Sequence, residues 1–117
     1  MTQITTIVHF EVPDDNIDEF LSFWQKTREA MVKQPGIISG VFHRGIDPEA
    51  AFQFINVARW QSAEALEAGL QATEEELRRK YGIEVAGTLR DLGAKVIQDN
   101  YVEEVDYTGE IQYSRAG

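Results

Sequence analysis

The stretch FQFINVARWQSAEAL, residues 52–66, decides the fold of this chain. Strand-like residues continue as far as Trp60, and the residues after Ser62 have the pattern of a helix start. One face of a strand over residues 51–60 carries Phe52, Phe54, Asn56, Ala58 and Trp60. The other face carries Ile55 and Val57, so large apolar side chains occupy both faces, and we expect both sides of the sheet to be covered.

Working outward from this strand, hydrophobic period and turn residues predict the remaining elements. We expect strands over residues 3–12, 36–46, 51–60 and 94–107, helices over 14–34 and 63–80, and a short helix over 84–92. The order βαββαβ with short connections predicts an α+β, ferredoxin-like fold. Its antiparallel sheet has the strand order 4-1-3-2 and both main helices on one face.

The uncovered sheet face predicts an oligomer. Two helices cover one face only, and a two-fold homodimer with its sheets face to face would cover the other. The whole chain, residues 1–117, is of a size that suits one domain. The final GEIQYSRAG, residues 109–117, is expected to extend the last strand or to pair with a partner chain.

Composition excludes several classes of function. The net charge is −9 and no stretch is rich in Lys or Arg, so we expect no nucleic-acid partner. The sequence has no cysteine, which rules out thiolate chemistry and iron–sulfur ligation. No apolar run approaches the ~20 residues that a membrane span needs, and the first residues lack a basic signal region. We therefore expect a cytoplasmic protein with no membrane association.

Two segments carry a resemblance to a known family. PGIISGVFHR, residues 35–44, followed by residues 52–66, resembles the antibiotic biosynthesis monooxygenase family. The resemblance covers roughly residues 3–80, and the segment after it looks like an insertion followed by the last strand. It implies a dimeric α+β barrel with a small-molecule pocket between each sheet and its helices. Some members oxygenate aromatic, polyketide-like compounds without metal or flavin, others bind and degrade haem, and others have no known activity.

The resemblance makes Trp60 and Asn56 candidate pocket residues. A tryptophan at this position lines the pocket of oxygenase and haem-degrading members, where its ring can stack on a flat substrate. Equally, Trp60 could close the core at the strand end. The amide of Asn56 could hold a substrate oxygen or dioxygen, or it could tie down a neighbouring element.

Phe23, Trp24 and Phe54 are further candidate substrate contacts. Phe23 and Trp24 belong to an apolar helical stripe that could form the opposite wall of the pocket, and Phe54 shares a strand face with Asn56. A stripe of this kind is also what a plain core helix shows.

His43 and His9 are the candidate catalytic bases, because they are the two histidines of the chain. An oxygenase without a cofactor must deprotonate its substrate, so that the carbanion can reduce molecular oxygen directly, and histidine suits that task. We expect both histidines at one end of the sheet, with Asn56 and Trp60 toward the other end. Either could equally be an ordinary polar strand residue.

The sequence argues against a metal or haem cofactor. The two histidines lie on non-adjacent strands, which gives no usual ligand spacing. The haem-degrading relatives use a histidine near the second helix, and residues 61–117 contain none. We therefore expect a monooxygenase that uses molecular oxygen as co-substrate. The alternative is a non-catalytic dimeric binding module, and a haem-degrading enzyme comes third.

Overall fold

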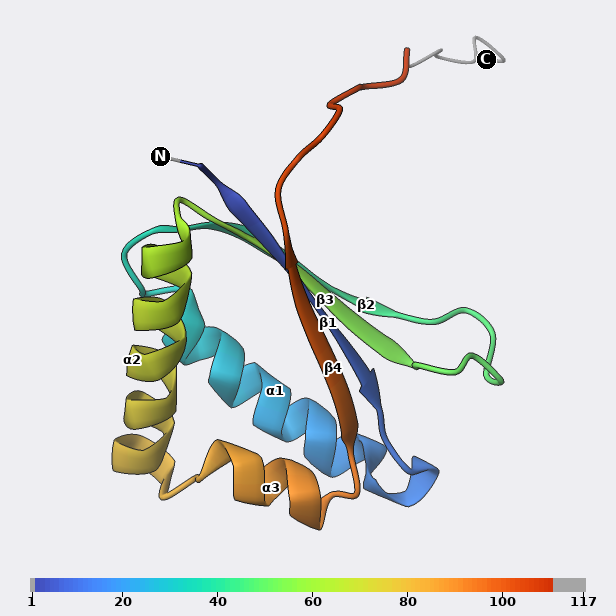
Figure 1. The fold of residues 1–117 in the computed structure, drawn as a ribbon. Helices are drawn as coiled ribbons and strands as arrows, with labels where there is room; N and C mark the ends of the chain where they lie inside the picture. Colours follow the sequence, from blue (N-terminus) through green and yellow to red (C-terminus); the bar gives the residue numbers. More distant parts are fainter. Residues whose placement is uncertain (1, 111–117) are drawn as a thin grey trace, which may run out of the picture.

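The computed structural model describes residues 2–110, which form one antiparallel sheet with its helices on one face (Figure 1). The strands are β1 Ile4–Glu11, β2 Ile37–Arg44, β3 Phe54–Trp60 and β4 Lys95–Tyr101. The helices are α1 Ile17–Met31, preceded by the short 3-10 helix η1 Asp14–Asn16, then α2 Ala63–Tyr81 and α3 Val85–Asp91. The sheet order is β2-β3-β1-β4, which confirms the predicted ferredoxin-like fold.

Local signals explain where α2 begins and ends. The Ser62 hydroxyl accepts a hydrogen bond of 3.0 Å from the backbone N–H of Ala65, as expected of an N-cap. Gly82 ends the helix in the left-handed conformation, with φ 66°, which glycine adopts without steric cost. No helix in residues 2–110 has both the length and the apolar character needed to cross a membrane.

Register fixes which residues share a face of the sheet. Asn56 of β3 pairs with Val8 of β1 and Phe42 of β2, and all three point toward the helices. Ile55 pairs with both histidines, so these three side chains share the opposite face.

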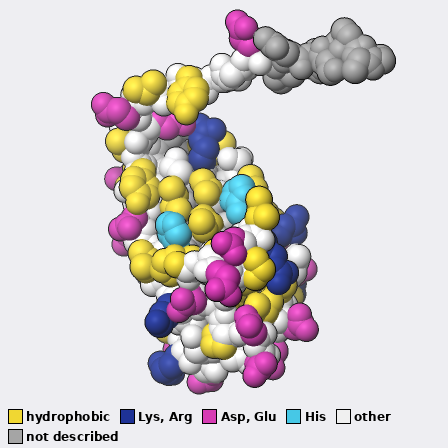
Figure 2. Space-filling view, turned by 90° about the vertical axis from the view of Figure 1, so that its right-hand side faces the viewer, with side chains coloured by type: hydrophobic (Ala, Val, Ile, Leu, Met, Phe, Trp, Pro, Cys, Tyr) yellow, Lys and Arg dark blue, Asp and Glu magenta, His cyan; other side chains and the backbone are white. Residues whose placement is uncertain are grey.

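The outer face, which we define as the sheet face away from the helices, exposes apolar side chains. Val41 is 55% exposed, Ile97 49% and Tyr101 48%. Figure 2 views this face and shows hydrophobic side chains gathered around the two histidines.

The third and fourth strands are shorter than predicted. β3 begins at Phe54 because the side chain of Gln53 bonds to the backbone of Val12, accepting from its N–H at 3.0 Å and donating to its carbonyl at 2.8 Å. The ring of Phe52 lies against His9 of the outer face, with centroids 5.4 Å apart, so its predicted place on the Phe54 face is wrong. β4 ends at Tyr101, and residues 102–110 run away from the sheet without regular structure (Figure 1). The predicted pairing of residues 109–117 falls almost wholly outside the described residues.

Candidate functional site

Asn56 interrupts the core in the middle of β3. On one side of it, Phe54 belongs to an apolar cluster with Phe10 and Phe20. On the other side, Ala58 and Trp60 belong to a second cluster. Because an amide replaces an apolar side chain between the two clusters, the core is open at this point.

Two cavities lie beside Asn56. The inner cavity, of about 210 Å³, lies between the sheet and all three helices, and its walls include Thr6, Phe23, Thr73, Leu89 and Gln98. The edge cavity, of about 220 Å³, lies between α1 and the β2–β3 edge, and its walls include Arg28, Val32, Ile37, Gly40 and Phe42. Trp24, Met31 and Asn56 line both. Mostly apolar walls with a few polar groups are typical of small-molecule sites.

The Asn56 amide faces these cavities. Asn56 is 5% exposed. Among residues 2–110, the side-chain polar atom that is completely buried without a hydrogen-bond partner is Trp60 Nε1 and not an atom of Asn56, so the Asn56 amide reaches the accessible space of the cavities. The arrangement is therefore what a binding site needs, because a ligand can form hydrogen bonds with this amide.

Aromatic side chains form the flat walls of the edge cavity. The rings of Trp24 and Phe42 stack with centroids 4.5 Å apart and planes 20° apart. Both residues are only half-buried, so aromatic surface remains accessible in the cavity.

Trp60 and Phe54 contribute to the core instead. Trp60 is 0% exposed and lines neither cavity, and its indole N–H has no hydrogen-bond partner among the described residues. Phe54 is likewise buried, and its ring stacks on Phe42. Of the predicted substrate contacts, the structure thus brings Asn56, Phe23 and Trp24 together at a cavity, while Trp60 and Phe54 lie behind its walls.

The two histidines are separated from this site by the sheet itself. His9 and His43 flank Ile55 on the outer face, whereas Asn56 points to the helix face. The expectation that they lie at the opposite end of the sheet from Asn56 is wrong, because they pair with the residue next to it. Neither histidine lines the inner or the edge cavity, so their role as bases stays a prediction.

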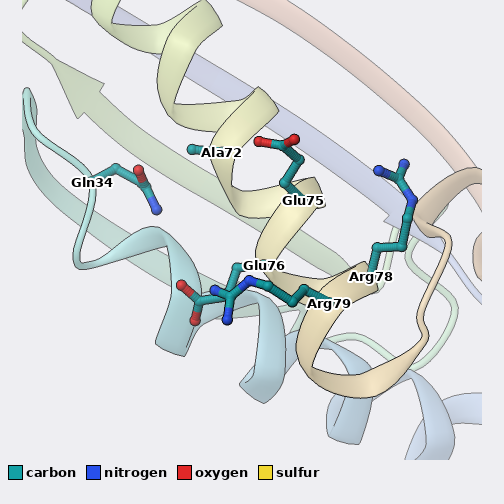
Figure 3. Close-up of a pocket in the computed structure, with 6 residues that line it drawn as sticks. All are labelled: Gln34, Ala72, Glu75, Glu76, Arg78 and Arg79. Carbon is teal, nitrogen blue, oxygen red and sulfur yellow. The ribbon is translucent and has the colours of Figure 1, made fainter.

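A larger hollow, of about 480 Å³, lies outside the core and is lined by Gln34, Ala72, Glu75, Glu76, Arg78 and Arg79. Figure 3 shows that all but Gln34 come from α2, and that the side chains spread out rather than converge on one point. We therefore place the candidate site at Asn56 and not in this hollow.

One ionisable group near this hollow has a shifted pKa. The Glu76 carboxylate accepts a 2.6 Å hydrogen bond from Lys33 Nζ, which lowers its pKa below the ordinary 4.5. Among the described residues, the ion pair that Glu76 makes is with Lys33, which follows α1.

Several cavity residues were not predicted from the sequence. Thr6 and Gln98 contribute from adjacent strands, and Gln98 Nε2 donates to Thr6 Oγ1 at 3.4 Å. α3 contributes Val85 and Leu89. Their helical spacing was visible, but the segment looked like an insertion, so its place on the pocket wall was not. Within residues 2–110 no group of three or more acidic or histidine side chains could hold a metal ion.

The fold is that of a ferredoxin-like α+β protein, with two cavities between the sheet and the helices. The profile of the antibiotic biosynthesis monooxygenase family matches residues 3–75, and the chain belongs to this family. No sequence among the curated proteins matches the chain.

Solved structures give the same assignment. A proposed monooxygenase from Shewanella loihica PV-4 is 30% identical, with a TM-score of 0.67 over 92% of this chain and 97% of that one. SnoaB from Streptomyces nogalater, described as a cofactor-independent oxygenase, is 21% identical, with a TM-score of 0.69 over 91% and 97%. A dimeric ferredoxin-like protein from an uncultured marine organism is 14% identical, with a TM-score of 0.66 over 92% and 100%. The last two likenesses are of fold.

Proposed function

We propose that this protein is a cofactor-independent monooxygenase that binds a flat aromatic or polyketide-like molecule beside Asn56. Family membership supports the reaction class, and SnoaB offers a precedent for oxygenation without a cofactor on this fold. The observation that carries the proposal is the Asn56 amide, a polar group that lines both of the mostly apolar cavities.

The proposed chemistry needs only the substrate, a base and dioxygen. The base removes a proton from an activated CH₂ group, and the electron pair of the broken C–H bond stays on the substrate carbon. This carbanion reduces dioxygen, so that one oxygen atom becomes the new carbonyl and the other leaves as water. Asn56 would hold a substrate oxygen next to the reacting carbon by donating a hydrogen bond to it.

His43 or His9 remains the proposed base, with a condition set by the geometry. Both side chains lie on the outer face, so the substrate must reach that face, or the dimer must bring a histidine to the cavity of its partner. Replacing both histidines by Ala tests the role. Unchanged oxygen uptake by the double variant would show that proton abstraction does not use them.

We also propose a homodimer that is closed through the outer face. Exposed Val41, Ile97 and Tyr101 would be covered by the same residues of a second copy. The relative described as a dimeric ferredoxin-like protein offers a precedent for a dimer of this fold. Light scattering should report about twice the chain mass of 13.3 kDa at micromolar concentration.

A second candidate function is a dimeric binding module without catalysis. The absence of histidine from the walls of both cavities favours it. The two functions differ in one measurement, because an oxygenase consumes dioxygen when an anthrone-type substrate is added and a binding module does not.

The decisive experiment changes Asn56 and measures two properties. Asn56→Leu replaces the cavity-lining amide by an apolar side chain that is larger but points into open space, so the free energy of unfolding should stay within about 1 kcal/mol of the wild-type value. The apparent affinity for an anthrone-type ligand, measured by thermal stabilisation, should fall about tenfold. The rate of oxygen uptake should fall by about the same factor. Asn100→Leu on the exposed part of β4 is the matched control and should change neither property.

Two results would contradict the proposal. If Asn56→Leu destabilises the protein by more than about 1 kcal/mol, the amide holds the structure together and is no ligand contact. A block of the cavity gives an independent check. Gly40→Leu places a leucine side chain in the edge cavity. Its Cβ would make only ordinary contacts, and the nearest atom is Ala58 Cβ at 3.7 Å. Ligand binding that survives this block would exclude the edge cavity as the site.

A further inference from the structure

The two cavities carry opposite charges. Arg28 lines the edge cavity, and Glu74 lines the inner cavity. Both side chains belong to exposed residues, and the Arg28 guanidinium forms no ion pair or hydrogen bond with another described residue. The charged ends therefore lie on either side of Asn56, which contributes to both cavities.

Helical spacing sets the position of Arg28. It follows Trp24 by four residues in α1, so the two side chains are neighbours on one face of the helix. Arg28 thus lines the edge cavity together with Trp24 and Phe42, while Val32 and Ile37 keep the rest of that cavity apolar. A cation in a cavity with aromatic and aliphatic walls matches an aromatic molecule with one negative end.

The negative net charge of the chain means that an anionic ligand needs the positive charge of Arg28 to bind at this cavity. The chain has a net charge of −9, so an anion approaching at random meets repulsion. An unpaired guanidinium at the cavity offsets that repulsion locally, and its planar fork suits a carboxylate or a phenolate. The Glu74 carboxylate at the inner cavity would repel the same group.

We propose that Arg28 binds the carboxylate or phenolate of a planar aromatic acid, whose ring lies against Trp24 and Phe42 and whose other end reaches Asn56. The charges fix the direction of binding, with the acidic group at the edge cavity and the neutral end toward the inner cavity. The inference rests on the proposed function, in that it needs a ligand beside Asn56, and it adds the charge and orientation of that ligand.

The test compares two probes of equal ring size, 2-naphthoate and 2-naphthamide, by isothermal titration calorimetry with the full chain. Arg28→Met should weaken naphthoate binding about tenfold, the loss expected for one charge-assisted hydrogen-bonded pair at a partly exposed site, and should leave naphthamide within about twofold. Arg28→Lys should keep part of the preference, because the charge remains while the fork is lost.

Lys26→Met is the matched control. It removes the same charge from the same helix, but Lys26 Nζ lies 5.3 Å from the ring centroid of Tyr81 in α2, and Lys26 lines neither cavity. This variant should bind both probes as the wild type does. A naphthoate loss as large as that of Arg28→Met would mean that overall charge decides, which overturns the proposal.

The remaining outcomes distinguish a failure of the Arg28 proposal from a failure of the proposed site at Asn56. If wild type binds both probes and Arg28→Met keeps its preference for naphthoate, the Arg28 proposal fails and the Asn56 site stands. If Asn56→Leu binds both probes unchanged, the site itself is wrong, and the Arg28 proposal fails with it. Thermal unfolding of each variant verifies that it is folded.

Discussion

The tight contact between Gly69 and Trp60 allows a sharp test of how the core is packed. Trp60 is fully buried at the end of β3, and its ring lies against α2 at Gly69. A Cβ added at Gly69 would lie 2.3 Å from Cζ3 and 2.5 Å from Cη2 of the indole, whereas ordinary contact begins at 3.4 Å. The new methyl is therefore more than 1 Å too close to a rigid ring, so Gly69→Ala requires the ring or the helix to move.

Two opposing terms decide the magnitude. Alanine is about 1 kcal/mol better than glycine in a helix interior. Overpacking a buried site costs about 1–3 kcal/mol, and a short contact with a rigid ring belongs at the upper end. We expect Gly69→Ala to lower the free energy of unfolding by about 1–2 kcal/mol, measured by urea denaturation, and to lower Tm by roughly 5 °C.

Gly87→Ala in α3 is the matched control. Its added Cβ would lie 3.3 Å from Arg90 Nη2, the end of a flexible side chain, and 3.2 Å from Glu84 Oε2, a flexible carboxylate that accepts the N-cap hydrogen bond from the Gly87 N–H. The change should alter stability by less than about 0.5 kcal/mol or raise it slightly.

A double variant identifies the cause. Trp60→Phe removes the part of the ring that the methyl would meet, so the combined cost of both changes should be smaller than the sum of the single costs by about 0.5 kcal/mol or more. A Gly69→Ala protein as stable as the wild type would refute the packing described for Trp60 and reopen its role as a pocket residue.

Three further predictions follow from other contacts. The pKa of Glu76 is lowered by the Lys33 hydrogen bond, so its stabilising effect is complete above pH 4.5 and is lost as the pH falls through its folded pKa; Glu76→Gln should flatten the pH dependence of Tm in this range, and an unchanged profile would contradict the assignment. Ser62→Ala removes the N-cap bond to Ala65 and should cost about 1 kcal/mol in urea denaturation, whereas Ser62→Asn should retain most of the stability. Val57→Asp on the outer face should convert the proposed dimer to a monomer by light scattering without loss of the circular dichroism spectrum, and a dimer that persists would rule out this face as the interface.

The fold was predictable because its signals are local and agree with one another. Period-2 and helical patterns, Ser62 as N-cap and Gly82 as the helix end fix the elements, and the connection lengths fix the strand order. Strand ends were less predictable. β3 starts at Phe54 because the Gln53 side chain bonds to Val12, a contact between residues that are 41 positions apart, and no pattern within residues 51–60 could reveal it.

The site was predictable only where a single strand or helix defines it. Asn56 stands out as an amide among apolar residues of one strand face, and Trp24 falls on the buried stripe of α1. Gln98 and Leu89 become cavity residues through the register of β4 and the position of α3, which depend on contacts across the whole domain. The histidines show the same limit, because their pairing partner places them next to Asn56 in register and on the opposite face.

The two faces of β3 explain why one short strand can serve both assembly and binding. Successive side chains alternate between faces, so a polar residue at position 56 opens a cavity on the helix side without exposing a polar group on the other side. Ile55 and Val57 can therefore keep an apolar surface on the outer face, while Asn56 between them faces the two cavities. It follows that a change at Val57 should alter assembly before binding, and a change at Asn56 should alter binding before assembly. If each substitution disturbed both properties equally, the interface and the site would not be the separate faces that the register shows.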